Sequence, residues 1–202
     1  MRIAILVEGA TEKAFKGVLH EFLKKKVPRN MPKLNFIVFN GRIPTGEKLK
    51  RTVEYLLQEG NQAVIALTDV YTGNNEFKSA QDAKEKMIGW VPNISDFYPH
   101  VALHDFEAWL FPFWSDIQQL AGSDKKSPNN NPEQINHGKP PAHVLNEIFR
   151  LGDKKKCYSK VRDSVRILRN KDLTVAAQAC PELKAFLNTI LILCRVPQSE
   201  LL

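Results

Sequence analysis

The stretch RIAILVEGATEKAF, residues 2–15, joins an apolar run to a periodic segment through a carboxylate and a glycine. The continuous apolar run, rich in β-branched residues, is typical of a strand buried on both faces of a sheet. After Gly9 the apolar side chains recur at the spacing of a helix with one face in water, and Thr11 is its expected N-cap. The stretch therefore predicts a strand, a tight turn and a helix, with Glu8 at the end of the buried strand.

The same alternation continues along the first half of the chain. Further buried strands are predicted at 34–41, at 63–70 and at the start of 98–111, and further helices at 46–60 and 76–88. Because strand and helix alternate three times, a parallel sheet with helices on its faces is the economical arrangement.

The composition changes in the second half of the chain. Residues 122–141 are rich in Asn, Pro and Lys and have no periodicity, as in a long loop that is either functional or poorly ordered. Beyond them, helices are predicted at 141–150, 158–169 and 181–194. We expect one compact domain, with an α/β core at 1–121, a loop at 122–141 and a helical elaboration packed on the core at 142–202.

Composition limits the class of protein. The 202 residues are 43% hydrophobic and 25% charged, which is ordinary for a globular chain, and the net charge of +7 suits a polyanionic partner or simply a basic cytosolic protein. The three cysteines lie far apart and indicate reduced thiols. The N-terminal apolar run is too short for a signal peptide, and no stretch has the roughly 20 apolar residues of a membrane helix. We therefore expect a cytoplasmic protein without a membrane partner.

Two acidic residues end two of the predicted buried strands. Glu8 follows the first strand directly, and Asp69 ends the strand at 63–70. Ligands of open parallel sheets bind at the carboxyl ends of strands, and neighbouring strands lie about 4.8 Å apart, so both carboxylates could reach one Mg²⁺. Either acid alone could instead cap a helix N-terminus, where the helix dipole stabilises an anion. The occurrence of both favours a metal site.

Three further residues belong to this expected site. Gly9 allows a tight turn and a close approach of the backbone to a ligand. Glu12 could supply a third oxygen, or only complement the helix dipole. Glu107 could supply another oxygen if the segment after the fourth strand swings in; alternatively a helix starts near Asp105 and leaves Glu107 in solvent. His104 is expected to be packed or hydrogen-bonded, because Mg²⁺ prefers oxygen ligands.

Three motifs together resemble the TOPRIM superfamily, in particular the small proteins related to the OLD-type nucleases and grouped as domain of unknown function family 4276. They are VEGATE at 7–12, LTDVY at 67–71 and HDFEAWLF at 104–111, with a weaker echo in GKPP and YSK within 138–160. The resemblance implies a Rossmann-like TOPRIM fold with about four mainly parallel strands, helices on both faces and a C-terminal helical elaboration. It also implies phosphoryl transfer on nucleic acid with Mg²⁺, or alternatively Mn²⁺.

The resemblance assigns roles residue by residue. Glu8 matches the family's glutamate and Asp69 the first acid of its Asp-x-Asp motif. The sequence departs from the family at the second acid, where Tyr71 removes one expected carboxylate. By resemblance alone, a separate ATPase partner and a role in phage defence are also implied.

Basic residues form two clusters that could follow phosphates or could be solvated helix faces. The first contains residues 24–26 and Arg29, and the second contains residues 154–156, Lys160, Arg162, Arg166 and Arg169. A cation at a helix N-terminus is poorly placed unless an anion attracts it. We therefore expect the ammonium of Lys160 to face the edge that carries Glu8 and Asp69, and we assign Lys160 a catalytic role beside Glu8.

These features favour a metal-dependent nuclease that acts on the phosphodiester bonds of nucleic acid, and DNA is a more strongly expected partner than RNA. Two other functions stay open. One is a catalytically weak nucleic-acid-binding or regulatory subunit, which the tyrosine at position 71 supports. The other is a small-molecule phosphotransfer enzyme that uses the same metal-binding carboxylates.

Overall fold

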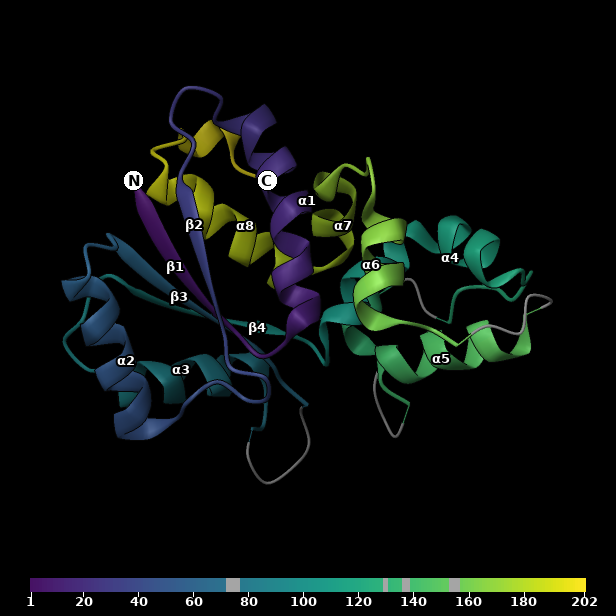
Figure 1. The fold of residues 1–202 in the computed structure, drawn as a ribbon, viewed down its shortest axis with the longest axis horizontal. Helices are drawn as coiled ribbons and strands as arrows, with labels where there is room; N and C mark the ends of the chain where they lie inside the picture. The colour runs from purple at the N-terminus through teal and green to yellow at the C-terminus, as the bar shows by residue number, and fades with distance from the viewer. Residues whose placement is uncertain (72–76, 129–130, 136–138, 153–156) are drawn as a thin grey trace.

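The computed structural model of the chain describes residues 1–71, 77–128, 131–135, 139–152 and 157–202. At its centre lies a parallel sheet of four strands in the order β2-β1-β3-β4 (Figure 1). The strands are β1 (Arg2–Val7), β2 (Lys33–Val38), β3 (Ala63–Asp69) and β4 (Phe97–Ala102). The arrangement confirms the predicted α/β class with its parallel sheet.

Strand register brings the candidate site positions to one edge of the sheet. Val7, the last residue of β1, pairs with Leu67 of β3, and Asp69 pairs with Ala102 at the end of β4. The carboxyl ends of three neighbouring strands therefore lie side by side. Glu8, Asp69 and the segment after β4 leave the sheet at the same edge.

Helices cover both faces of the sheet (Figure 1). The helices α2 (Gly46–Gln58) and α3 (Ala80–Trp90) lie on one face, and α1 (Ala10–Lys26) and α8 (Pro181–Leu193) lie on the other. Alternate residues of β1 belong to the two cores, with Ile3 and Ile5 in the α1 and α8 core. The neighbouring Ala4 and Leu6 pack in the α2 and α3 core. Burial on both faces explains why the first strand is apolar at every position after Arg2.

The first helix begins earlier than the sequence predicts. α1 starts at Ala10 with Gly9 as its N-cap, so Thr11 lies inside the helix and is not the cap. The reason is that Glu12 reaches back and accepts a hydrogen bond from the Gly9 N–H at 3.1 Å. A glutamate at this position satisfies one of the free N–H groups at the helix start, as in a capping box.

After β4 the chain forms a series of short helices. They are the 3₁₀ helices η1 (Phe106–Phe113), η2 (Pro132–Gln134) and η3 (Gln198–Glu200), and the α-helices α4 (Trp114–Ala121), α5 (Pro141–Leu151), α6 (Lys160–Leu168) and α7 (Leu173–Ala179). The helices α4 to α7 lie beside the sheet, whereas α8 returns to its face (Figure 1). The sequence pattern does not predict α7. Of the described helices, none is both long and apolar enough to cross a membrane.

A buried carboxylate between α4 and α5 holds the start of α8. Glu133 accepts hydrogen bonds from Trp109 Nε1 at 3.2 Å and from the backbone N–H groups of Glu182 at 3.0 Å and Leu183 at 3.3 Å. These N–H groups have no partner within the helix, and the helix dipole favours an anion beside them. The stretch expected to be a loop thus contributes a structural contact to the sheet-covering helix.

Replacing Glu133 by Ala should lower the free energy of unfolding by about 2–4 kcal/mol, because three N–H groups lose their acceptor in the protein interior. Burial raises the pKa of Glu133 to about 6. An acid with a raised folded-state pKa contributes most stability at low pH, and this contribution is lost as the pH rises through the folded pKa. In urea unfolding, lowering the pH from about 7 to about 5 should therefore raise the free energy of unfolding more in the wild type than in the Glu133→Ala variant. The exposed Glu85→Ala variant is the control; an equal loss there would contradict the role of Glu133.

Candidate active site

Five acidic side chains gather at the carboxyl edge of the sheet. Glu8 follows β1, Asp69 ends β3, Glu12 lies in the first turn of α1, and Asp105 and Glu107 lie at the start of η1. The negative charges of the other four act on Asp69. We call these five residues the carboxylate cluster. It contains the four acids that the sequence assigns to a metal and adds Asp105.

Asp69 lies at the end of β3, where the charges of the other four acids act on it. Its Oδ1 accepts a hydrogen bond from the backbone N–H of Phe106 at 3.2 Å, which ties the end of β3 to the start of η1. Burial, followed by the charges of the other four acids, raises the pKa of Asp69 well above its usual range. The end of β3 is therefore a place where negative charge is costly without a cation.

Glu8 and Glu12 approach Asp69 from β1 and α1. The Thr68 hydroxyl donates a hydrogen bond to Glu8 Oε1 and so links β3 to the residue after β1. Burial raises the pKa of Glu8; the Thr68 hydrogen bond opposes this rise and the charge of Glu12 adds to it. A Cβ atom at Gly9 would lie 3.2 Å from Glu12 Oε2, so the glycine permits the close approach that the cap requires.

Asp105 is fully buried, and the sequence interpretation, which places it near a helix cap, does not assign it to the site. Its Oδ2 accepts hydrogen bonds from the Ala142 backbone N–H at 3.1 Å and from the Tyr71 hydroxyl at 3.4 Å. Its Oδ1 is buried and has no hydrogen-bond partner among the described residues. Burial raises the pKa of Asp105, although the Ala142 N–H and the charge of Lys160 oppose the rise. A buried, unpartnered carboxylate oxygen is costly unless a cation or a proton meets it.

Glu107 is buried with a side chain only 1% exposed, so the alternative that leaves it in solvent is wrong. Lys160 Nζ lies 3.4 Å from Glu107 Oε1, and the Tyr158 hydroxyl lies 3.5 Å from the same oxygen. Burial raises the pKa of Glu107 to about 7; Asp105 adds to this rise and Lys160 opposes it. The carboxyl group of Glu107 can therefore gain or lose a proton near neutral pH.

The elaboration carries Lys160 to the carboxylate cluster as the first residue of α6. Burial lowers the pKa of Lys160, but the charges of Glu107, Asp105 and Asp69 outweigh this effect, and the pKa is raised overall. The ammonium is therefore held in its charged form. Residues 154–156 of the second basic cluster lie outside the described residues.

A family model described as Domain of unknown function (DUF4276) matches residues 7–191. The chain belongs to this family. The match spans the whole carboxylate cluster and Lys160, and it confirms the family named in the sequence resemblance.

Solved structures similar to this DUF4276 chain come from OLD proteins. The C-terminal region of the Burkholderia pseudomallei OLD protein is 13% identical with a TM-score of 0.47, over 96% of both chains. The C-terminal region of the Xanthomonas campestris pv. campestris OLD protein phased with iodine is 13% identical with a TM-score of 0.44, over 96% of this chain and 98% of that one. No curated protein matches the chain significantly.

Tyr71 of the DUF4276 chain occupies the position at which the resemblance expects a second acid. Besides the hydrogen bond of its hydroxyl to Asp105, its ring lies 6.3 Å from the ring of His104, measured between centroids. His104 is buried, 4% exposed, in this contact. Tyr71 therefore contributes a neutral donor to the cluster in place of a carboxylate.

The donor chemistry of the cluster fits a hard divalent cation. All five members offer carboxylate oxygens, which Mg²⁺ and Mn²⁺ prefer, and the unpartnered Asp105 Oδ1 adds an uncompensated acceptor. Within the part of the chain that the structure describes, no three Asp, Glu, His or Cys side chains are grouped as metal ligands. Coordination would therefore require these side chains to turn toward a shared ion.

Replacing Tyr71 by Asp should have opposite effects with and without a divalent cation. In EDTA the new carboxylate adds repulsion to the cluster and removes the donor to Asp105, so the free energy of unfolding should fall by about 1–3 kcal/mol. With Mg²⁺ or Mn²⁺ the extra oxygen should tighten binding in a calorimetric titration. Tyr71→Phe, which removes the hydroxyl without adding charge, is the control. Equal metal affinities of the wild type and the Asp variant would mean that another carboxylate already supplies this ligand.

Proposed function

We propose that the chain is a TOPRIM-type nuclease that cleaves phosphodiester bonds of nucleic acid with Mg²⁺, or Mn²⁺ in its place. The observation that carries the proposal is the meeting of five carboxylates and the ammonium of Lys160 at one edge of a parallel sheet. Phosphoryl transfer needs cations that offset the negative charge on the transferred group and the leaving oxygen. The motifs that contain Glu8 and Asp69, which resemble those of TOPRIM proteins, support the same chemistry.

Four residues of the cluster, together with Gly9 and Lys160, have roles in this proposal. Glu8 and Asp69 hold the ion, with Glu12 and Glu107 as further oxygen ligands, and the Gly9 turn keeps the backbone close to the bound group. The ion, when bound, would polarise the scissile phosphate and activate water. Lys160 stabilises negative charge on the phosphate from the side of α6.

The wider setting belongs to the proposal as well. DNA rather than RNA as the expected nucleic acid, a separate ATPase partner and a role in phage defence rest on the resemblance in sequence. A cytoplasmic location rests on the composition and the three thiols, of which Cys180 and Cys194 are buried and Cys157 is exposed.

A second function is favoured by Tyr71. Because this residue replaces the second acid of the Asp-x-Asp motif and bonds Asp105, the chain could bind nucleic acid and cleave it weakly or not at all. In this case it would act as a regulatory subunit. A third function, phosphotransfer on a small molecule, would use the same cluster.

Incubation of the purified protein with supercoiled plasmid, single-stranded DNA and RNA separates these functions. The expected result is cleavage in Mg²⁺ or Mn²⁺, no cleavage in EDTA, and none by Glu8→Gln, which keeps an acceptor for the Thr68 hydroxyl. Binding without cleavage in every metal would support the regulatory subunit. Hydrolysis of phosphate esters with all three nucleic acids intact would support the small-molecule enzyme.

A further inference from the structure

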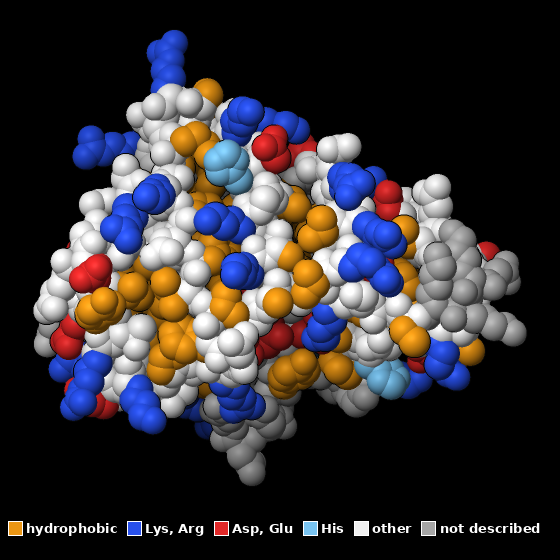
Figure 2. All heavy atoms as spheres, in the orientation of Figure 1, with side chains coloured by type: hydrophobic (Ala, Val, Ile, Leu, Met, Phe, Trp, Pro, Cys, Tyr) orange, Lys and Arg blue, Asp and Glu red, His pale blue; other side chains and the backbone are white. Residues whose placement is uncertain are grey.

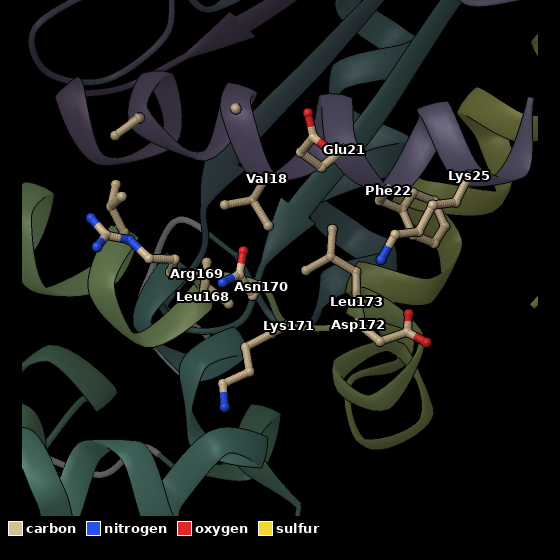
Figure 3. A pocket seen from close by; sticks show the side chains of 13 residues that line it. Val18, Glu21, Phe22, Lys25, Leu168, Arg169, Asn170, Lys171, Asp172 and Leu173 are labelled. Carbon is tan, nitrogen blue, oxygen red and sulfur yellow. The ribbon is translucent and has the colours of Figure 1, made fainter. Parts of the chain in front are cut away.

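A groove lies between α1 and the chain that leads from α6 to α7, with a volume of about 310 Å³ (Figure 3). Its apolar floor is formed by Val18, Phe22, Leu168 and Leu173. A pocket of this volume accommodates a group the size of a nucleobase or a small ligand.

The two elements that form the banks of the groove are both basic. α1 carries five lysines and two glutamates, and residues 160–172 carry five Lys or Arg and two Asp. Each of these segments therefore has a net charge of +3, and among the residues that line the groove itself Lys25, Arg169 and Lys171 outnumber Glu21 and Asp172 by one. Lys and Arg side chains cover both sides of an apolar strip on this face of the molecule (Figure 2). This distribution suits a polyanionic ligand.

Two cations on the rim are available to such a ligand. Lys25 and Arg169 line the groove and are exposed, and neither has a carboxylate within ion-pair distance among the described residues. The neighbouring Lys171, by contrast, lies 2.8 Å from Asp116. Asp172, which also lines the groove, accepts a hydrogen bond from the Thr174 N–H at the start of α7, and the charges of Lys25 and Lys26 act on it as well.

The groove and the carboxylate cluster lie at different positions along the same two helices, α1 and α6. Glu12 in the first turn of α1 and Lys160 at the start of α6 both belong to the cluster end. Gly17 and Leu168, which line the groove, follow five and eight residues later, or roughly 7–12 Å along a helix at 1.5 Å per residue. This separation corresponds to about two to four nucleotides at a rise of about 3.4 Å along a strand.

We propose that this groove binds a single strand of nucleic acid that continues to the carboxylate cluster. One base lies on the apolar floor, the flanking phosphates lie beside Lys25 and Arg169, and the Asn170 amide at the rim meets the base edge. A paired base is excluded because it would have to leave its duplex to reach the floor. The direction of the strand toward the cluster rests on the proposed function, but binding in the groove requires no cleavage.

Gly17 allows a steric test that does not change charge. A Cβ atom built on Gly17 meets nothing within 4 Å, so a larger side chain can be accommodated in the helix while it projects into the groove. Gly17→Leu should therefore keep or raise the melting temperature, because leucine favours a helix more than glycine does. It should also fill part of the floor on which the base is expected to lie.

The test measures fluorescence anisotropy of labelled oligonucleotides in EDTA, where cleavage is blocked. Wild type should bind single-stranded DNA or RNA of about 12 nucleotides more tightly than a duplex of the same length. Arg169→Glu combined with Lys25→Glu should weaken single-strand binding by at least about tenfold and reduce its salt dependence. Gly17→Leu should weaken it by at least about fivefold. Lys48→Glu, an exposed change on α2 at the other face of the sheet, should bind as the wild type does.

The outcomes of these measurements test the proposed groove and the proposed nuclease activity separately. Unchanged binding by both groove variants, or a preference for the duplex, would overturn the groove even if the protein cleaves nucleic acid. A mononucleotide that binds as tightly as the oligonucleotide would overturn it as well and would indicate a small-molecule site. Groove variants that lose binding while the wild type cuts no substrate would support the groove and count against the nuclease.

Discussion

Replacing Asp69 by Asn should abolish cleavage, with a loss of at least about 1,000-fold, and should stabilise the fold in the absence of metal. The amide side chain would keep an oxygen that accepts the Phe106 N–H but would lose the charge that a cation requires. The same substitution removes one negative charge from a position on which four other carboxylates act. A gain in stability together with a loss of activity is the expected signature of an ion-binding residue.

The direction of the stability change follows from the raised pKa of Asp69. Burial and the neighbouring acids raise this pKa, so the folded state binds the proton more tightly than the unfolded state does. The favourable contribution of this group is therefore present at low pH and is lost as the pH rises through the folded pKa. In EDTA at about pH 8, the Asp69→Asn variant should melt about 2–8 °C higher than the wild type, and this difference should shrink as the pH falls.

Addition of Mg²⁺ should reverse the order of the two melting temperatures, so that the wild type melts higher than the Asp69→Asn variant. The ion stabilises the folded wild type by binding to it, whereas the Asp69→Asn variant binds the ion weakly and should gain little. Asp96→Asn is the matched control, because Asp96 is exposed and precedes β4 at the opposite end of the sheet. An Asp69→Asn protein that melts lower than the wild type in EDTA, or that still cleaves, would contradict the role given to Asp69.

The sheet and the acidic residues at its carboxyl edge could be predicted from sequence because both depend on local pattern. The run after Arg2 is apolar at each position since alternate residues enter two different cores, and the chain leaves the sheet at a charged residue. Two features of the sequence therefore identify Glu8 and Asp69: each lies at the end of a buried strand, and each is acidic. Parallel topology then places them at one edge without further information.

Other parts of the site depend on contacts between distant segments. Asp105 has the sequence context of a helix cap, and only its contacts with Tyr71 and Ala142 reveal a buried acid. The one local signal is its position directly before FEAWLF, a stretch that is apolar except for Glu107, where a charged residue would be drawn into the interior. Glu133 lies in a stretch without periodicity, and its bonds to the start of α8 become visible only in the folded chain.

Lys160 could be predicted in part from local sequence and in part depends on contacts between distant segments. Its place in a basic stretch at a helix start suggested an anionic neighbour, and the structure supplies one in Glu107. The sequence could not indicate which acid this would be, because Glu107 is also compatible with a solvated helix start. The contact depends on how α6 packs beside η1 and α1, which is a property of the elaboration as a whole.

Replacing Lys160 by Met should lower cleavage by about 100- to 1,000-fold while the melting temperature changes by only a few degrees. The side chain is 51% exposed, so little packing is lost, but the phosphate loses its cation. Because Lys160 holds down the pKa of Glu107, which is about 7 in the wild type, this pKa should rise in the Met variant. The residual activity and the Mg²⁺ affinity should then require a higher pH, since Glu107 binds the ion only when ionised. Lys160→Arg, which keeps the charge, should preserve the pH profile. A Met variant with the wild-type maximal rate but a shifted profile would reduce Lys160 to a charge partner of Glu107, and a Met variant with both the rate and the profile of the wild type would contradict both roles.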